Sequence, residues 1–303
     1  MSRRELRNVP ASVRALLLNE ARASGDSFDQ VLQYFAIERF LYRLSKTAWS
    51  ERFIIKGATM LRAWGGSLGR PTRDIDFLGR VDNSPEAILG VVRECLAVEY
   101  PEDGIVFDRE LETAAINTER VYPGVRVVLR GNLDGAVFKL QLDIGIDDAV
   151  VPDPAWIEYP TLLDLAAPRI LAYQPTTALA EKYETIVDRD VDNSRLRDYY
   201  DIWLVSKSRA ISGSELAAAI AATFAHRGTL LTAEIPPGLT EVFYENPAAQ
   251  SRWRSFLMTK RVDAPGDLAV VCAAIVTFIM PPAIAVASGT QFASMWDPST
   301  GWA

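Results

Sequence analysis

The sequence predicts an α+β fold, in which a lobe built on a mixed sheet is followed by an all-helical lobe. In the first half, strand and helix patterns are interspersed without the regular alternation of a doubly wound fold. After Pro152-Asp153-Pro154, the periodic segments have helical spacing. The 303 residues are enough for two compact lobes, which we place at 1–155, with N-terminal helices, and at 156–303.

The elements of the first lobe follow from local patterns. Ser27 is the N-cap of a helix, because apolar residues follow it at helical spacing as far as Leu44. The run Phe53-Ile54-Ile55 is followed by Lys-Gly, which indicates a buried strand that ends in a turn. A helix over 59–64 then leads through a loop with Gly and Pro to a strand over 74–78.

The rest of this lobe is expected to complete the sheet. Ser84 caps a helix that has Pro85 at its first position and extends to about Val98. Strand-like runs follow over 105–116, 121–130 and 136–146. Because Asn132-Leu133-Asp134-Gly135 is a hairpin signal between the last two runs, the sheet is expected to be mixed or largely antiparallel.

The second lobe is expected to consist of helices. The segments with helical spacing are 161–170, 177–188, 196–206, 212–224, 248–260 and 267–280. The stretch 268–288 is almost uncharged and has the length of a membrane span. Pro281-Pro282 interrupts it, so we expect a buried helix that ends at Met280 and no membrane association. Trp296 and Trp302 are expected to pack back on the body.

Charge and residue usage exclude several classes of function. With 32 basic and 39 acidic residues, the chain does not fit a protein that coats nucleic acid broadly, so any such contact is a local patch or is bridged by metal. His226 is the single histidine, which excludes a histidine-rich metal centre, and its place near a helix C-terminus indicates a structural role. Cys95 and Cys272 lie far apart among apolar residues, which predicts buried free thiols and suits the reducing cytoplasm.

Two acidic residues in the predicted strand over 74–78 are candidate metal ligands. Asp74 and Asp76 share one face of the strand, while Ile75 and Phe77 point into the core. Two carboxylates on one face repel unless something neutralises them. Mg²⁺ fits, because it uses one or two carboxylates and takes water and phosphate as its other ligands. The alternative is a solvated strand face near a sheet edge.

Other charged residues extend this hypothesis. Asp143 ends an alternating strand on the same face as Lys139 and Gln141, so it is a candidate third metal ligand or general base, or else a turn residue. Lys56-Gly57 precedes a helix start, where backbone N–H groups and the helix dipole favour an anion such as a triphosphate.

The second lobe adds its own group of charges. Lys182 lies on a predicted helix, and Asp198 and Asp201, spaced i and i+3, share the face of another. The alternative for this group is a solvated charged face.

Four motifs, in this order, resemble the AbiEii/AbiGii-type nucleotidyltransferase toxins, a family that includes the MenT-like toxins of bacterial toxin–antitoxin systems. The motifs are Phe-Ile-Ile-Lys-Gly-Ala, Arg-Pro-Thr-Arg-Asp-Ile-Asp-Phe, Ala-Glu-Lys and Arg-Asp-Tyr-Tyr-Asp, within residues 28 to 205. The family belongs to the DNA polymerase β-like nucleotidyltransferase superfamily. The resemblance therefore implies a nucleotidyltransferase lobe at 1–155.

The resemblance assigns roles to residues of the first lobe. It implies that Lys56, Gly57 and Ala58 form a phosphate-binding turn. Many superfamily members have Gly-Ser there, so Ala58 lacks one hydroxyl contact with phosphate. It also implies that Asp74 and Asp76 bind the metal. Asp143 as the third carboxylate rests on the strand pattern more than on a motif.

It also assigns roles elsewhere. Thr72 matches a Ser/Thr position that is phosphorylated in some relatives to silence the toxin. Lys182 matches the nucleotide-contacting lysine of the third motif. Asp198 and Asp201 match the acidic positions of the fourth motif, and either of them is the catalytic one.

The implied activity is transfer of a nucleoside monophosphate from an NTP, with Mg²⁺ or Mn²⁺ as cofactor and release of pyrophosphate. In relatives the acceptor can be the 3′ end of tRNA, so that translation is blocked. The implied partners are RNA, foremost tRNA, and a cognate antitoxin or a regulatory kinase. Candidate phosphate contacts, or else ordinary surface charges, are Arg120, Arg126, Arg130, Arg252, Arg254, Lys260 and Arg261.

Two alternative functions stay open. One keeps the fold and transfers the nucleotide to a protein or a small molecule. The other is a module that binds GTP or another NTP without turnover. A positive groove beside Asp74 and Asp76 favours RNA, and metal-dependent release of pyrophosphate separates an enzyme from a binding module.

Overall fold

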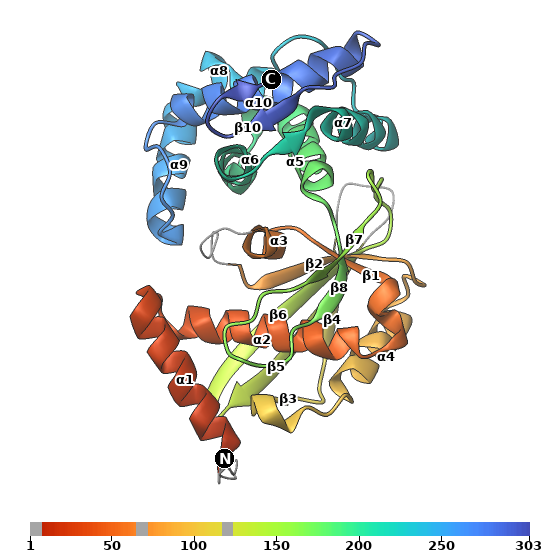
Figure 1. Cartoon of the computed structure of the whole chain (residues 1–303), viewed down its shortest axis with the longest axis vertical. Helices are drawn as coiled ribbons and strands as arrows, with labels where there is room; N and C mark the ends of the chain where they lie inside the picture. The colour runs from red at the N-terminus through yellow and green to blue at the C-terminus, as the bar shows by residue number, and fades with distance from the viewer. Residues whose placement is uncertain (1–7, 65–71, 117–123) are drawn as a thin grey trace. The chain divides into compact units, whose positions relative to one another are not determined.

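The computed structural model describes residues 8–64, 72–116 and 124–303, and these residues form two compact units (Figure 1). The first unit contains 8–63, 72–147 and 155–172, and the second contains 64, 148–154 and 173–303. The first unit carries a mixed sheet and the second is mainly helical, which confirms the predicted α+β class. The sheet unit extends past the boundary that we expected at residue 155, because residues 155–172 contribute two strands to it.

The described part of the first unit contains α-helices and short 3₁₀ helices. They are α1 (Val9–Ser24), α2 (Phe28–Ser45), α3 (Thr59–Ala63) and α4 (Pro85–Leu96), with the 3₁₀ helices η1 (Ala48–Glu51) and η2 (Pro101–Asp103). The Ser27 hydroxyl accepts a hydrogen bond from the backbone N–H of Gln30, and that of Ser84 accepts one from Ala87, as predicted. Helix α2 is buried along most of its length and packs on β6 and β8 of the sheet.

Eight strands of the described residues form one sheet in the order β3-β5-β6-β2-β1-β8-β7, with β4 paired to β5. They are β1 (Phe53–Lys56), β2 (Asp74–Gly79), β3 (Val106–Phe107), β4 (Glu112–Ile116), β5 (Gly124–Leu133), β6 (Ala136–Gly145), β7 (Ala155–Glu158) and β8 (Arg169–Ala172). β2 pairs with β6, and β1 with β8, in parallel, while the other pairs are antiparallel. The prediction of a mixed sheet is confirmed.

The hairpin between β5 and β6 was predicted correctly. Asp134 and Gly135 both have positive φ, 48° and 81°, as a two-residue turn between twisted strands requires. The strand predicted over 105–116 is instead two short strands, β3 and β4, because the polar run between them leaves the sheet. The start of the strand predicted at 121–130 and the loop before β2 lie partly outside the described residues.

The helix predicted over 161–170 is wrong. Residues 160–168 form an irregular segment between two prolines, and β7 and β8 pair at its ends. Two fully buried residues of α2 bind its backbone. Glu38 accepts a hydrogen bond of 2.8 Å from the N–H of Leu162, and Arg39 donates one of 3.0 Å to the carbonyl of Ala166. These contacts replace the hydrogen bonds of a helix.

The second unit confirms the other predicted helices. Its elements are α5 (Pro175–Arg189), α6 (Leu196–Ser208), α7 (Gly213–Arg227), α8 (Glu241–Tyr244), α9 (Pro247–Lys260), α10 (Leu268–Ala287), the 3₁₀ helices η3 (Asp190–Asp192) and η4 (Pro237–Leu239), and a small sheet of β9 (Ile211–Ser212), β10 (Met295–Asp297) and β11 (Gly301–Trp302). His226 lies in the last turn of α7, as predicted. Cys95 and Cys272 are buried free thiols, also as predicted.

Helix α10 does not end at Met280 as expected, but continues through both prolines to Ala287. Pro282 has no N–H to give to the carbonyl of Phe278, four residues earlier. The indole N–H of Trp302 donates to that carbonyl at 3.0 Å instead. The indole of Trp296 donates to the carbonyl of Ser206 at 2.8 Å, so the tail packs back on the unit, as predicted.

By length and composition, α10 is apolar enough to cross a membrane, with a mean hydropathy of 2.4. Half of this apolar window is buried within the protein, where α10 packs on α6 and α7. A core helix of a soluble protein has the same properties, so the helix does not by itself indicate a span. The expectation of no membrane association stays a prediction.

Candidate active site

The two candidate metal ligands lie on one face of β2, as the alternation predicted. Asp74 and Asp76 are half-buried, whereas Ile75 and Phe77 between and after them are buried in the core. Strand β2 lies inside the sheet, between β1 and β6, so the alternative of a sheet edge is wrong. Both carboxylates therefore lie on a face whose backbone is fixed on each side by a neighbouring strand.

The register of the sheet brings the other predicted residues to Asp76. Lys56, the last residue of β1, lies opposite Asp76 on one side. Asp143 of β6 lies opposite Asp76 on the other side, and Gln141 lies opposite Asp74. The Lys56 motif, the Asp74-Ile75-Asp76 motif and Asp143 thus meet at one point of the sheet.

The turn after β1 approaches Asp76 very closely. Gly57 has a φ of 71°, which favours glycine, and a Cβ built at this position would lie 2.0 Å from Oδ2 of Asp76. Ala58 is buried. Helix α3 has five residues, too few for a large helix dipole, so any anion at this turn depends on backbone N–H groups and on Lys56.

Two threonines fix the backbone of Asp74. The hydroxyl of Thr59 donates to the Asp74 carbonyl at 3.2 Å, and the hydroxyl of Thr72 donates to the same oxygen at 3.2 Å. Thr72 also accepts from the Asp74 N–H at 3.4 Å. The sequence reasoning missed Thr59, although a hydroxyl directly after the Lys-Gly-Ala motif was a signal. Its hydroxyl is bonded to protein and does not replace the serine that Ala58 lacks.

Asp143 is held by Arg126, which the sequence had suggested as a phosphate contact or an ordinary surface charge. Arg126 donates from Nε and Nη2 to the two carboxylate oxygens of Asp143, both at 2.8 Å. These hydrogen bonds raise the pKa of Arg126, and the charges of Asp143, Asp74 and Asp76 act in the same direction. The pairing was readable from the sequence, because the predicted hairpin sets Arg126 directly opposite Asp143.

This arrangement fits a metal with two protein carboxylates. Asp74 and Asp76 offer hard oxygen donors on one face, and the absence of a side chain at Gly57 lets the turn lie directly against Asp76. Within the described residues, no group of three or more His, Cys, Asp or Glu side chains is placed to hold a metal ion. Asp143 as a third ligand stays a prediction, which requires that Arg126 release one of its oxygens.

In the second unit, Lys182 of α5 binds both acidic residues of α6. Its Nζ donates to Asp198 at 3.0 Å and to Asp201 at 2.7 Å, and both carboxylates are buried. The alternative of a solvated charged face is therefore wrong. Arg195 donates to the other oxygen of Asp198 at 2.9 Å. Burial alone would raise the pKa of Asp198, but the charges of Lys182 and Arg195 and the hydrogen bond from Lys182 lower it to about 2.

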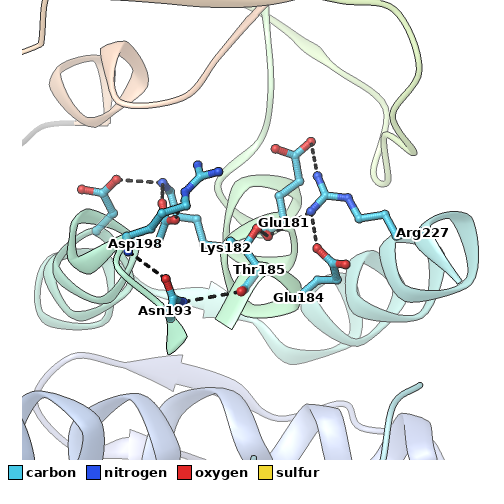
Figure 2. Close-up of polar contacts among 9 residues, drawn as sticks. Glu181, Lys182, Glu184, Thr185, Asn193, Asp198 and Arg227 are labelled. Carbon is cyan, nitrogen blue, oxygen red and sulfur yellow. Dashed lines mark hydrogen bonds and ion pairs between the residues drawn. The ribbon is translucent and has the colours of Figure 1, made fainter. Parts of the chain in front are cut away.

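A second ion cluster fixes α5 beside Lys182. Figure 2 shows that Lys182 points toward Asp198, whereas Glu181 and Glu184 point toward Arg227 at the end of α7. Arg227 donates to Glu184, to the carbonyl of Glu181 at 3.2 Å, and to Asp148 at 3.3 Å. Burial alone would lower the pKa of Arg227, but these three acidic residues raise it. The cluster sets the position of the turn of α5 from which Lys182 projects.

The candidate phosphate contacts have different environments. Arg126 is paired with Asp143, and Arg130 with Glu112 at 2.6 Å. In the second unit Arg252, Arg254 and Arg261 are exposed and Lys260 is half-buried, on or directly after α9. Arg120 lies outside the described residues. Ordinary surface charge therefore remains an adequate explanation for this set.

Residues 39–269 match a family model described as nucleotidyl transferase AbiEii toxin of type IV toxin–antitoxin systems. A crystal structure of a Helicobacter pylori protein assigned as a nucleotidyltransferase is similar, with 16% identity and a TM-score of 0.45, over 83% of this chain and 91% of that one. The structure of JHP933 from Helicobacter pylori has 15% identity and a TM-score of 0.44, over 83% and 88% of the two chains. No curated protein matches the chain.

Proposed function

The chain belongs to the AbiEii family of nucleotidyl transferase toxins of type IV toxin–antitoxin systems, and we propose that it transfers a nucleoside monophosphate from an NTP to RNA, at the 3′ end of tRNA. The family supplies the reaction class, the NTP substrate and a cognate antitoxin. The RNA acceptor, the Mg²⁺ dependence and the residue roles are proposals. Transfer to the tRNA 3′ end would block aminoacylation and so stop translation.

One observation carries the proposal, namely the contact between the glycine turn and Asp76. The close approach of Gly57 brings the turn next to a carboxylate that shares its strand face with Asp74. A turn for phosphate and a carboxylate pair for metal are the two parts that nucleotidyl transfer needs, because little covalent chemistry is left for the protein. In this fold they are adjacent through strand pairing.

Each residue of the site then has a defined task. Asp74 and Asp76 would hold Mg²⁺ or Mn²⁺, and the metal would supply positive charge to neutralise the charge that develops on the phosphates. We assign Lys56 and the N–H groups at Gly57 and Ala58 to phosphate oxygens, and Lys182 of the second unit to a nucleotide contact.

A carboxylate takes the proton of the attacking hydroxyl, and pyrophosphate leaves. Asp143 and Asp201 are the candidates. Both oxygens of Asp198 accept hydrogen bonds from cations, Lys182 and Arg195, so we assign Asp198 to the positioning of Lys182. Both oxygens of Asp143 also accept hydrogen bonds, from Arg126, so Asp143 would act as the base only after Arg126 releases one of them.

Thr72 is the proposed control point of the site. Its hydroxyl bonds both backbone polar groups of Asp74, so a phosphoryl group on that oxygen would remove the donor and add negative charge beside the metal ligands. A kinase that modifies Thr72 is therefore a plausible form of antitoxin, next to a protein that binds the toxin. We place the protein in the cytoplasm, where NTPs and tRNA occur and where its two buried free thiols stay reduced.

Release of pyrophosphate tests the reaction class. The wild type is incubated with total tRNA and each NTP separately, with Mg²⁺ or with EDTA, beside an Asp76→Asn variant. We expect Mg²⁺-dependent release with one or more NTPs, and none from the variant. If pyrophosphate is released but no nucleotide is added to tRNA, the acceptor is a protein or a small molecule. NTP binding without release identifies a binding module and contradicts the proposal.

A further inference from the structure

A pocket of about 380 Å³ opens beside Asp74, within the first unit. Its volume lies in the range of roughly 300–1,000 Å³ that is usual for small-ligand sites. The first turns of α2, the start of β2 and the outer half of β6 form its walls. It therefore continues the strand face that carries the proposed metal ligands.

The order of the strands indicates which of the two substrates, the NTP or the acceptor, lies at this pocket. β2 lies between β1 and β6. The turn proposed for the NTP phosphates follows β1, whereas the pocket lies on the β6 flank, where Gln141 is the partner of Asp74 and also lines the pocket. In phosphoryl transfer the attacking and leaving oxygens are roughly in line across the phosphorus. With the triphosphate on the β1 flank, the β6 flank faces the attacking group.

The side chains of the pocket suit one nucleotide unit. Val137 is 73% exposed, which gives a base an apolar surface, whereas Leu32 is buried in the wall behind the pocket. Arg73 and Lys139 are exposed, and neither takes part in an ion pair among the residues that the structure describes. Gln33 donates to the carbonyls of Arg73 and Lys139, at 3.3 and 3.0 Å, and so fixes the two backbones that carry these cations.

The charge of the pocket argues against a triphosphate. Arg73 and Lys139 are accompanied by the carboxylates of Asp29 and Asp74, so the lining is close to neutral. A polyphosphate would meet as much negative as positive charge there. A single phosphodiester with its base and ribose suits this balance better, because one phosphate can bind the two cations at the rim.

We propose that this pocket binds the 3′-terminal nucleotide of the acceptor RNA. Its phosphate contacts Arg73 and Lys139, its base packs on Val137, and its hydroxyl faces Asp74. The inference deepens the proposed function and rests on it, since it names the acceptor subsite of the same reaction. Arg126 and Arg130, which are paired with carboxylates, then take no part in binding the terminal nucleotide.

Direct RNA binding tests the pocket without relying on turnover. The probe is a fluorescent hairpin RNA with a single-stranded CCA 3′ end, measured by anisotropy against wild type, Arg73→Ala and Lys139→Ala. Arg93→Ala removes an exposed cation of α4, outside the pocket, and is the matched control. We expect the pocket variants to bind about tenfold more weakly, with the salt slope reduced by roughly 0.7 for each lost phosphate contact. The control and the NTP affinity stay unchanged.

Several results would overturn the inference. One is equal RNA affinity of wild type and both pocket variants, and another is weaker NTP binding with normal RNA binding, which would assign the pocket to the donor. If the pocket variants transfer nucleotide to RNA with an unchanged KM for RNA, the proposed function holds but the pocket is not the acceptor site. If the pocket variants bind RNA more weakly but the wild type releases no pyrophosphate from any NTP, the pocket binds RNA and the transfer reaction is contradicted.

Discussion

Gly57 and Asp76 are so close that a Cβ on residue 57 would lie 2.0 Å from Oδ2 of Asp76. The φ of Gly57, 71°, adds a second reason for glycine at this turn. The contact joins two motifs that lie apart in the sequence, because β1 and β2 pair with Lys56 opposite Asp76. The turn and the carboxylate pair are therefore one structure.

Replacing Gly57 by alanine should abolish activity rather than folding. The new methyl group must displace the Asp76 carboxylate, and a misplacement of about 1 Å can cost on the order of 100-fold in rate. Gly25→Ala is the matched control, since Gly25 has a φ of 77° and no atom within 4 Å of its Cβ position. Both variants should lose about 1–2 kcal/mol of stability from the left-handed backbone. Equal activity of the two variants would show that the contact with Asp76 does not matter.

Thr72 separates the effect of charge from the effect of a lost hydrogen bond. Thr72→Asp places a carboxylate beside Asp74 and should lower kcat/KM at least about tenfold. Thr72→Val keeps the shape, loses the two hydrogen bonds to Asp74, and should retain most of the activity. Steady-state transfer assays and a growth assay of toxicity measure both. If the valine variant is as inactive as the aspartate variant, Thr72 is a structural residue and no charge switch.

Asp198 should make the stability depend on acid pH. Its pKa is lowered to about 2 in the folded protein from an unfolded value of 3.8, so its contribution of about 2 kcal/mol is complete above pH 4 and is lost as the pH falls through 2. Asp198→Asn should therefore be less stable than wild type at pH 7, with a difference that narrows below pH 4. Asp188→Asn, an exposed change on α5, is the control. Denaturant unfolding at several pH values measures this, and a pH-independent difference would contradict it.

Trp302 should stabilise the prolines inside α10. Trp302→Phe keeps an aromatic ring but leaves the carbonyl of Phe278 without its 3.0 Å partner, at a cost of about 1–3 kcal/mol. Pro282→Ala restores the helical N–H for the same carbonyl. In the Pro282→Ala background, Trp302→Phe should lower the free energy of unfolding by clearly less than it does in the wild type. A double-mutant cycle of unfolding free energies detects this difference. Additive costs would mean that the indole does not replace the missing helix bond.

Much of the fold was predictable because it follows from local signals. Ser27, Ser84 and the Asp134-Gly135 turn fixed two helix starts and one hairpin. The alternation of β2 placed Asp74 and Asp76 on one face. Errors arose where tertiary contacts replace local ones. Segment 160–168 forms hydrogen bonds with two side chains of α2. The spacing of apolar residues within the segment gives no sign of these contacts.

The site was predictable in its residues and less so in their pairing. Sequence reasoning identified Lys182, Asp198 and Asp201 but treated a solvated face as an alternative, because burial depends on the packing of α5 and α6. It treated Arg126 as a phosphate contact or an ordinary surface charge, although the register of the predicted hairpin sets this residue opposite Asp143. Carrying that register through would have found the ion pair.

The most direct test of the central claim follows the α-phosphate of the NTP. Total tRNA is incubated with Mg²⁺ and each α-labelled NTP in turn, with wild type, Asp76→Asn and the Gly25→Ala control. We expect that label from one or more NTPs is attached to tRNA by the wild type and by the control. No label is expected on tRNA with Asp76→Asn. Labelling that persists in Asp76→Asn, or release of pyrophosphate with no label in tRNA, would contradict it.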